Sequence, residues 1–445
     1  MNTRRTASGL AALAAMALVA TACGSSSPSS TAPSSGGSSG PSLPNLSGKS
    51  VSVEAVWTGA EQATFMKVAK GFESATGATV NYTSDGDNLP TVLATKVSGG
   101  SPPDIGVLPQ PGLMAQFAQA GNLKPADSSV SQAISANYPS IWKQLGSVNN
   151  KLYGVWVDAS NKSTTWYNPA LYSQAGITSV PQDWPTFVKD LGTLSDSGVT
   201  VPLSIGGADG WTLTDWFENV YIRTAGTAMY DKLTKHQIPW TDPSVIKALN
   251  ILKALWSNQR YIGSPASALQ VDFPTSVANV FSSKAKSAVV YEGSFVAAAI
   301  TDKSFKPGTT AKWFPFPSIN GSGPSVVGGG DVAVTFTGTP AAEAFLAYLA
   351  SPAAAAAMVS TGSFTSANKS LNPSAYPDSN SRSVGQAIVN AGNNFRFDMS
   401  DQEPSAFGGT PGAGEWKDLQ DFLSNPSNPA ATARQLEADA AKAYK

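Results

Sequence analysis

The stretch from residue 206 to residue 226 carries aromatic and acidic side chains of the kinds that bind polar ligands. Trp211, Asp215 and Trp216 lie around the predicted start of a helix, whose apolar residues recur with the helical period. Thr212 and Asp215 have the spacing of a capping box, with Thr212 as the N-cap. Two interpretations follow: Trp211 and Trp216 form a hydrophobic staple at the helix start, or they form one wall of a ligand cleft.

Catalytic chemistry has few candidate residues in this chain. His236 is the only histidine, and its polar neighbours indicate a solvated loop. A Ser-His-Asp triad or a zinc site would depend on it, and neither a GxSxG nor an HExxH string is present. We therefore predict a protein with no catalytic residue, metal or cofactor. A glycoside hydrolase needs only two carboxylates across the scissile bond, so it stays as the alternative function.

Strands and helices alternate in the first part of the folded body, which indicates a mostly parallel, doubly wound α/β sheet. Ligands of such sheets bind beyond the carboxyl ends of the strands. Strands are predicted over 51–57, 78–83 and 104–108, and helices over 60–76, 89–98 and 112–120. The candidate ligand residues after the strand ends are Trp57, Glu61, Asp85 and Gln110.

Local structural roles compete with ligand binding at most of these positions. Trp57 also fits the core face of its strand, Glu61 suits a helix N-terminus, and Asp85 suits a turn beside a glycine. Gln110 stands between two prolines that hold it rigid, which favours a functional role.

Further candidates lie in the second part of the chain. Asp158 opens a small polar hinge, and Glu292 and Phe295 follow a strand predicted over 287–291. Asp331 follows three glycines within a strand predicted over 327–336. Trp416 begins an apolar helix face, so a place in the core competes with ligand contact there.

The N-terminus has the pattern of a secretory signal peptide. Two arginines precede an apolar run over 10–20, which is too short to cross a bilayer about 30 Å thick. Cys23, the only cysteine, follows this run and resembles the lipid-bearing residue of bacterial lipoproteins. We predict a signal peptide over 1–22, and a lipidated Cys23 with a disordered Ser/Gly/Pro tether over 23–47.

Charge and length limit the remaining partners. The net charge is -1 and charged residues make up 13% of the chain, so we expect no nucleic-acid partner. No second apolar span of membrane length is present, so membrane contact is expected through the lipid anchor only. The body from residue 48 onward is long enough for two domains.

Short strings distributed along the body resemble one family. In chain order they are W-T-G-x-E from Trp57, F-E-x-x-T-G from Phe72, P-D-I-x-x-x-P-Q-P-G from Pro103, Y-G-V from Tyr153, W-Y-N-P from Trp166, G-W-x-x-T-D-W from Gly210, E-G-S-F from Glu292, G-G-D-V-A-V from Gly329 and R-F-D-x-S-D from Arg396. Together they resemble the family 1 extracellular solute-binding proteins of ABC sugar importers, which are maltose-binding-like, and especially the α-glucoside-binding branch.

This resemblance implies a periplasmic-binding-protein-like (type II) fold, in which crossing hinge segments join two doubly wound α/β lobes. Lobe one is expected over 48–158 plus 332–366, and lobe two over 159–331 plus 367–445. The implied crossings are Asp158, the glycine run before Asp331 and the turn at 364–368.

The same resemblance implies a function for the candidate residues. An α-glucoside-type di- or oligosaccharide would bind between the lobes, and hinge closure would present it to a transmembrane permease. The protein would act as a monomer at the outer face of the membrane. Phe295 stands where the family commonly has a larger aromatic ring under the sugar. A binding protein for a peptide, a polyol or another non-sugar solute would share the fold and stays as a further alternative.

Overall fold

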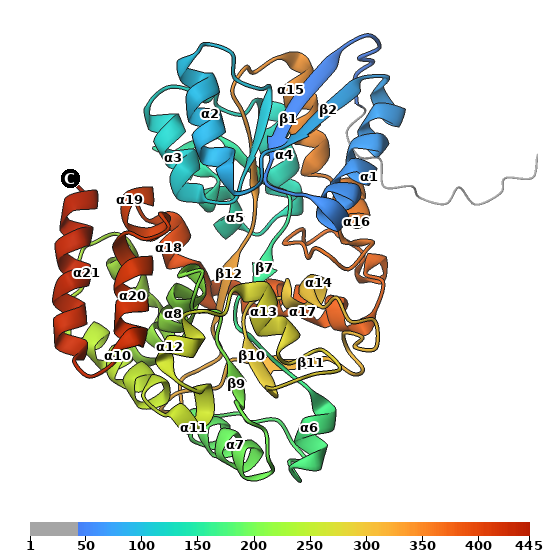
Figure 1. The fold of residues 1–445 in the computed structure, drawn as a ribbon. Coiled ribbons are helices and arrows are strands. Elements are labelled where there is room, and N and C mark those ends of the chain that lie inside the picture. Colours follow the sequence, from blue (N-terminus) through green and yellow to red (C-terminus); the bar gives the residue numbers. More distant parts are fainter. Residues whose placement is uncertain (1–42) are drawn as a thin grey trace, which may run out of the picture. The chain divides into compact units, whose positions relative to one another are not determined.

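The computed structural model describes residues 43–445 (Figure 1). The predicted signal peptide, Cys23 and the tether as far as residue 42 lie outside the described residues. The prediction that the tether continues to residue 47 is wrong. Leu46 is buried in the first hydrophobic core, and its backbone N–H donates to the carbonyl of Thr76 at 2.7 Å. Leu43 also packs against this core, so two leucines within a polar segment hold the chain onto the body.

The first sheet has the strand order β2-β1-β3-β13-β6. Strand β1 pairs in parallel with β2 and with the central strand β3, and β13 runs antiparallel to β3 and β6. Its strands are β1 (Ser50–Ala55), β2 (Thr79–Ser84), β3 (Ile105–Leu108), β6 (Gly154–Trp156) and β13 (Val332–Thr335). Its associated elements are α1 (Gly59–Thr76), η1 (Gly86–Asn88), α2 (Leu89–Ser98), α3 (Pro111–Gln119), α4 (Ser128–Asn137), α5 (Ser140–Leu145), β4 (Ser147–Val148), β5 (Lys151–Leu152), α15 (Pro340–Leu349), α16 (Pro352–Val359) and η2 (Pro373–Ala375).

The second sheet has the strand order β11-β8-β10-β9, with β8 antiparallel to both of its neighbours. Its strands are β8 (Thr164–Tyr167), β9 (Leu203–Ser204), β10 (Val289–Tyr291) and β11 (Lys312–Pro315). The associated helices are α6 (Pro169–Gln174), α7 (Trp184–Asp196), α8 (Trp211–Ala225), α9 (Thr227–Thr234), α10 (Pro243–Trp256), α11 (Gln259–Ile262), α12 (Pro265–Ala268), α13 (Phe273–Ala278), α14 (Val296–Ala299), α18 (Met399–Gln402), α19 (Ser405–Gly408), α20 (Gly414–Ser424) and α21 (Pro429–Ala443). The helix α17 (Ser379–Ala391) instead adjoins strands β7 (Ser160–Asn161) and β12 (Val326–Gly329), and η3 (Gly392–Asn394) follows it.

A third, small sheet lies between the two larger ones (Figure 1). In it, β12 (Val326–Gly329) pairs with β7 (Ser160–Asn161) on one side and β14 (Phe395–Phe397) on the other. An isolated bridge pairs Ala159 with Thr365 beside this sheet. The three predicted crossing regions therefore lie next to one another, and the lobe boundaries stay a prediction.

The single strand predicted over 327–336 is wrong, because the structure divides it into β12 and β13, which belong to different sheets. The break falls at Gly330, whose φ is 157°. The next residue, Asp331, is held in the turn because its N–H donates to Asp158 Oδ1 at 2.7 Å and its carbonyl accepts from Val157 N at 3.0 Å.

Apolar side chains form a separate core under each large sheet. The first core is built on β1, β3 and β13 with α1 and α15, and the second on β9 and β10 with α8 and α10. Among residues 43–445, no single helix is long and apolar enough to cross a membrane. The pair α15 and α16 passes that test of length and composition only together, with a bend of 65° between them.

We predict that Gly330→Ala destabilises the fold. An added Cβ would lie 2.6 Å from the carbonyl oxygen of Asp158 and 3.2 Å from the Cα of Ala159, and both are backbone atoms. The expected loss in unfolding free energy is about 1–3 kcal/mol, measured by urea denaturation. Gly323→Ala is the matched control, since no atom lies within 4 Å of its added Cβ. Equal stability of the two variants would contradict the prediction.

Candidate functional site

A cavity of about 340 Å³ lies beside the three crossing segments. Its walls come from the first sheet, the crossing strands, the start of α8 and the start of α20. The predicted site residues that line it are Trp57, Glu61, Gln110, Asp158, Trp211, Phe295, Asp331 and Trp416. Asp85, Asp215, Trp216 and Glu292 do not line this cavity. Ligand contact by any of these residues remains a prediction.

Aromatic rings form two parts of the cavity wall. Trp57 is buried at the end of β1, where its ring centroid lies 5.2 Å from those of Phe65 and Phe364. Trp211 is half-buried, and its ring centroid lies 5.9 Å from that of Phe295. Trp57 therefore belongs to the core and to the cavity at once, so its two interpretations are compatible.

The start of α8 differs from the predicted capping box. The helix begins at Trp211, and its N-cap is Gly210, whose φ is 78°. Thr212 therefore lies inside the first turn, where its hydroxyl donates to the carbonyl of Gly206 at 2.7 Å. The predicted staple is also wrong, because Trp211 is the first helical residue rather than the residue before the cap. Its ring instead contacts Phe273, with centroids 5.4 Å apart.

Trp216 is buried away from the cavity. Its ring packs edge-on against Tyr291 and Phe316, with centroid distances of 4.5 and 5.7 Å. Asp85 lies at the start of η1, where its N–H donates to the carbonyl of Ala55 at 3.0 Å. His236 is also less exposed than predicted, because its Nε2 lies 3.1 Å from a carboxylate oxygen of Glu437.

Carboxyl groups meet where the chain crosses between the sheets. Trp57 Nε1 donates to Asp331 Oδ2 at 3.2 Å, and Asp158 accepts the N–H of Asp331. Burial, with a smaller contribution from the nearby carboxylate of Glu61, raises the pKa of Asp158 to about 7. Burial and the neighbouring Asp158 also raise the pKa of Asp331 well above its usual range. Such a pair shares protons, so it can both donate and accept hydrogen bonds near neutral pH.

One buried ammonium group, that of Lys162, lies behind Trp211. It is 3.2 Å from Asp215 Oδ1, 2.5 Å from Asp398 Oδ2 and 3.7 Å from Asp401 Oδ2. Burial alone would lower the pKa of Lys162, but these carboxylates outweigh it and raise the pKa well above its usual value. Lys162 lines the cavity, and its Nζ lies 5.8 Å from the centroid of the Trp211 ring.

The pKa values of the carboxyls around Lys162 are shifted in different directions. Burial would raise the pKa of Asp398, but Lys162 and several hydrogen bonds hold it below its usual range. Burial dominates at Asp215, whose pKa is raised well above the usual value, and at Glu292, whose pKa is raised to about 8. Both of these side chains are buried, and neither lines the cavity.

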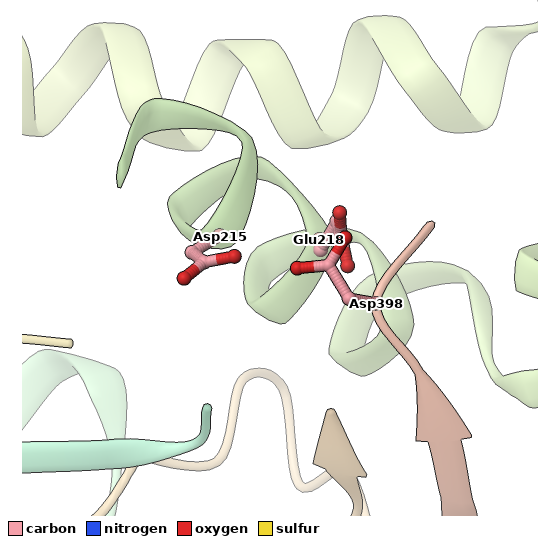
Figure 2. A group of neighbouring side chains, drawn as sticks. All are labelled: Asp215, Glu218 and Asp398. Carbon is pink, nitrogen blue, oxygen red and sulfur yellow. The ribbon is translucent and has the colours of Figure 1, made fainter. Parts of the chain in front are cut away.

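Asp215, Glu218 and Asp398 form a group whose spacing could hold a metal ion. Figure 2 shows Asp215 and Glu218 on one helix, with Asp398 approaching from the end of β14. Lys162 already neutralises Asp215 and Asp398. Glu218 accepts hydrogen bonds from the Tyr230 hydroxyl and from the backbone N–H groups of residues 399 and 400. The protein's own groups therefore bind all of these carboxylate oxygens except Asp215 Oδ2, and we assign no metal to the cluster.

Sequence reasoning missed several cavity residues. They are Lys162, Phe364, Thr365, Asn380, Ser400 and Asp401. Two signals for them were present: Lys162 lies in the polar hinge 158–163, and Asp401 ends the R-F-D-x-S-D string. Nothing in the sequence shows that these two residues pair, because 239 positions of chain separate them and only the fold brings them together.

The two sheets, the crossing strands between them and the cavity beside those strands define a two-lobed α/β ligand-binding protein. Residues 57–356 match the sequence profile of a family described as bacterial extracellular solute-binding protein. The chain belongs to this family.

Individual relatives agree with this assignment. The osmoprotective compounds-binding protein GgtB of Synechocystis sp. is 33% identical over 386 residues, which cover 84% of this chain and 89% of the relative. The alpha-glucosides-binding periplasmic protein AglE of Rhizobium meliloti is 31% identical over 397 residues, or 86% of this chain and 85% of that protein. A solved chitin oligosaccharide binding protein has a TM-score of 0.72 at 21% identity, covering 89% of this chain and 98% of the other. The predicted type II fold is confirmed.

We predict that Lys162→Met lowers the unfolding free energy at neutral pH by about 3–5 kcal/mol, because it leaves buried carboxylates without their cation. The loss should be smaller at pH 5, where those carboxyls can take up protons. Urea denaturation at both pH values measures the effect. Lys417→Met is the control, since Lys417 forms an exposed pair with Asp421. A similar small effect for both variants would show that Lys162 is not needed to neutralise the cluster.

Stability should fall as the pH rises from about 5 to about 8. Burial raises the folded-state pKa of Asp158 and Asp401 to about 7 and that of Glu292 to about 8, whereas unfolded carboxyls titrate near about 4. The folded state therefore binds more protons, and this stabilisation is lost as the pH passes through the folded pKa values. The pKa of Asp398 is lowered instead of raised, so this group changes the stability only at pH values below this range. Thermal unfolding at constant ionic strength tests the trend, and Glu292→Gln should reduce its slope. A melting temperature that is constant or rises over this range would contradict it.

Proposed function

We propose that this protein is the sugar-capturing subunit of an ABC importer, and that it takes an α-glucoside-type di- or oligosaccharide into the cavity beside its crossing strands. The observation that carries the proposal is the meeting of aromatic rings and polar groups in that one cavity. A sugar presents apolar ring faces to aromatic side chains and hydroxyl groups to hydrogen-bonding partners, and this lining offers both.

The polar groups are suited to a neutral ligand. Carboxyls with raised pKa values at Asp158 and Asp331 can donate to one hydroxyl and accept from another. Gln110 adds an amide with both functions, and the ammonium of Lys162 is already neutralised by its carboxylates. The cavity volume of about 340 Å³ is near the lower end of small-molecule sites, which favours a disaccharide over a long chain.

The relatives support this ligand class. AglE of Rhizobium meliloti is named for binding alpha-glucosides, and it aligns with most of this chain. We extend that ligand to this protein because the cavity has the required chemistry. By the same argument the lobes close over the sugar, and a membrane permease receives it from the closed form. Lipidation at Cys23 would keep the protein at the outer face of the membrane.

A second candidate is a binding protein for a non-sugar solute such as a polyol. GgtB of Synechocystis, the relative at 33% identity, is named for osmoprotective compounds. A polyol has the hydroxyl groups of a sugar but lacks its flat ring face. The aromatic walls at Trp57 and Trp211 therefore favour the sugar.

Titration with a panel of α-linked disaccharides tests the function. We expect saturable quenching or enhancement of tryptophan fluorescence and a rise in melting temperature, since the ligand prefers the folded state. Chromatography of the sugar after incubation should show that it is unchanged. Release of monosaccharide at a catalytic rate would replace the proposal with the glycoside hydrolase, and a response to polyols alone would favour the second candidate.

Trp211→Ala should weaken sugar affinity by about tenfold or more, because it removes one aromatic wall. Its effect on melting temperature should be smaller, since the ring is only half-buried. Trp184→Ala is the matched control: Trp184 is also half-buried and contacts two rings, but it does not line the cavity. Calorimetric titration measures both variants. Unchanged affinity in folded Trp211→Ala would show that this tryptophan serves the fold alone.

A further inference from the structure

A second cavity, of about 520 Å³, lies on the other side of the crossing segment from the first one. Asn161 and Ser163 line it, whereas Ser160 and Lys162 line the first cavity. Successive residues of an extended segment point to opposite faces, so β7 and the residues after it separate the two cavities. We call the second cavity the rear pocket. It lies among β7, β12, the end of β11 and the end of α17.

The rear pocket has an apolar wall and a rim of amides. Trp313, Pro315 and Val326 supply apolar surface from β11 and β12. The side-chain amides around it are those of Asn161, Gln182, Asn390 and Asn394. This combination of apolar walls with a few polar groups is typical of small-molecule sites.

Arg223 of α8 is a buried cation in the lining of this pocket, with 7% of its surface exposed. Its Nη1 donates to Asn219 Oδ1 at 2.9 Å and its Nη2 to the carbonyl of Ser325 at 3.0 Å. Its guanidinium carbon lies 4.7 Å from the centroid of the Phe316 ring. All of these partners are neutral.

No carboxylate among the described residues forms an ion pair with Arg223, although the same lobe buries several carboxyls. The nearby acids are instead neutralised by Lys162 or hydrogen-bonded to other groups. Burial, offset only in part by the nearby Tyr291, lowers the pKa of Arg223 to about 10, and no carboxylate contributes. A buried cation without a counterion is costly, so an anion that reaches it gains a strong, charge-assisted interaction.

We propose that the rear pocket is a second binding site, and that it takes a small organic carboxylate whose anionic group pairs with Arg223 and whose apolar part lies against Trp313, Pro315 and Val326. The position of the pocket makes this site separate from the sugar cavity. The apolar wall distinguishes its ligand from an inorganic anion, which would leave that wall in contact with water.

Benzoate and benzamide are the probes that test this site, because they have nearly the same shape and differ in charge. Calorimetric titration of the full chain should show benzoate binding at least about tenfold tighter than benzamide. Equal affinities, or no benzoate binding at millimolar concentration, would overturn the proposal.

Variants then locate the binding. Arg223→Gln should remove the preference for benzoate, and Trp313→Ala should weaken both probes. Arg260→Gln is the matched control, because Arg260 is exposed and pairs with Asp196, and it should leave both affinities unchanged. Trp211→Ala in the first cavity should also leave benzoate binding intact. Retained preference in Arg223→Gln, or lost binding in Trp211→Ala, would overturn the proposal. If Arg223→Gln does not fold, Trp313→Ala and Trp211→Ala still decide where benzoate binds.

Discussion

The ion-pair cluster around Lys162 joins three parts of the chain that are far apart in sequence. The lysine follows β7, Asp215 lies on α8, and Asp398 and Asp401 lie between β14 and the end of α18. Because all these groups are largely removed from water, their charges interact strongly and the cost of separating them is high. The ammonium group of Lys162 therefore helps to fix the position of α8 relative to the crossing segment, together with the hydrogen bonds of Asn219 to that segment.

The walls of the first cavity depend on the same cluster. Trp211 begins α8, so its ring is placed by whatever holds that helix, and Lys162 lies 5.8 Å from it. Glu218, on the same helix, fixes the start of α18 by accepting hydrogen bonds from the N–H groups of Met399 and Ser400. Asp215 and Glu218 do not line the cavity, but they position residues that do. This role explains why these acidic side chains are buried rather than exposed.

Sequence patterns predict the elements well where local rules decide. The helix over 89–98 coincides with α2, and Gly77 ends α1 in the left-handed conformation expected of it. The patterns fail where tertiary contacts decide. The glycines before Asp331 are compatible both with one flexible strand and with a change of sheet. Only the pairing of β12 with β7 and of β13 with β3 shows that the chain changes sheet there. The start of α8 fails for a similar reason, since the positive φ of Gly210 lets the helix begin earlier than the threonine signal indicates.

The prediction of site residues also succeeds where local rules decide and fails where tertiary contacts decide. Residues at strand ends, such as Trp57 and Gln110, are found because the topology of an α/β sheet dictates where its ligands bind. Lys162 and Asp401 cannot be found in this way, since each is significant only through its distant partner. Arg223 is the extreme case: within its helix it reads as a basic residue of the last turn, where a cation is favoured by the helix dipole. Only its burial without a carboxylate distinguishes it from such a residue.

The crossing segment gives the two cavities a common wall, and this has a mechanical consequence. Ser160 and Lys162 face the first cavity, while Asn161 and Ser163 face the rear pocket. Ser163 is held on both sides, because its hydroxyl donates to Asn219 Oδ1 and accepts the N–H of Val327. Asn219 in turn accepts a hydrogen bond from Arg223 and donates to the carbonyl of Lys162. If the lobes rotate about this segment, Lys162 and Arg223 would move together, and a ligand that prefers one position of the segment in either cavity would alter the affinity of the other.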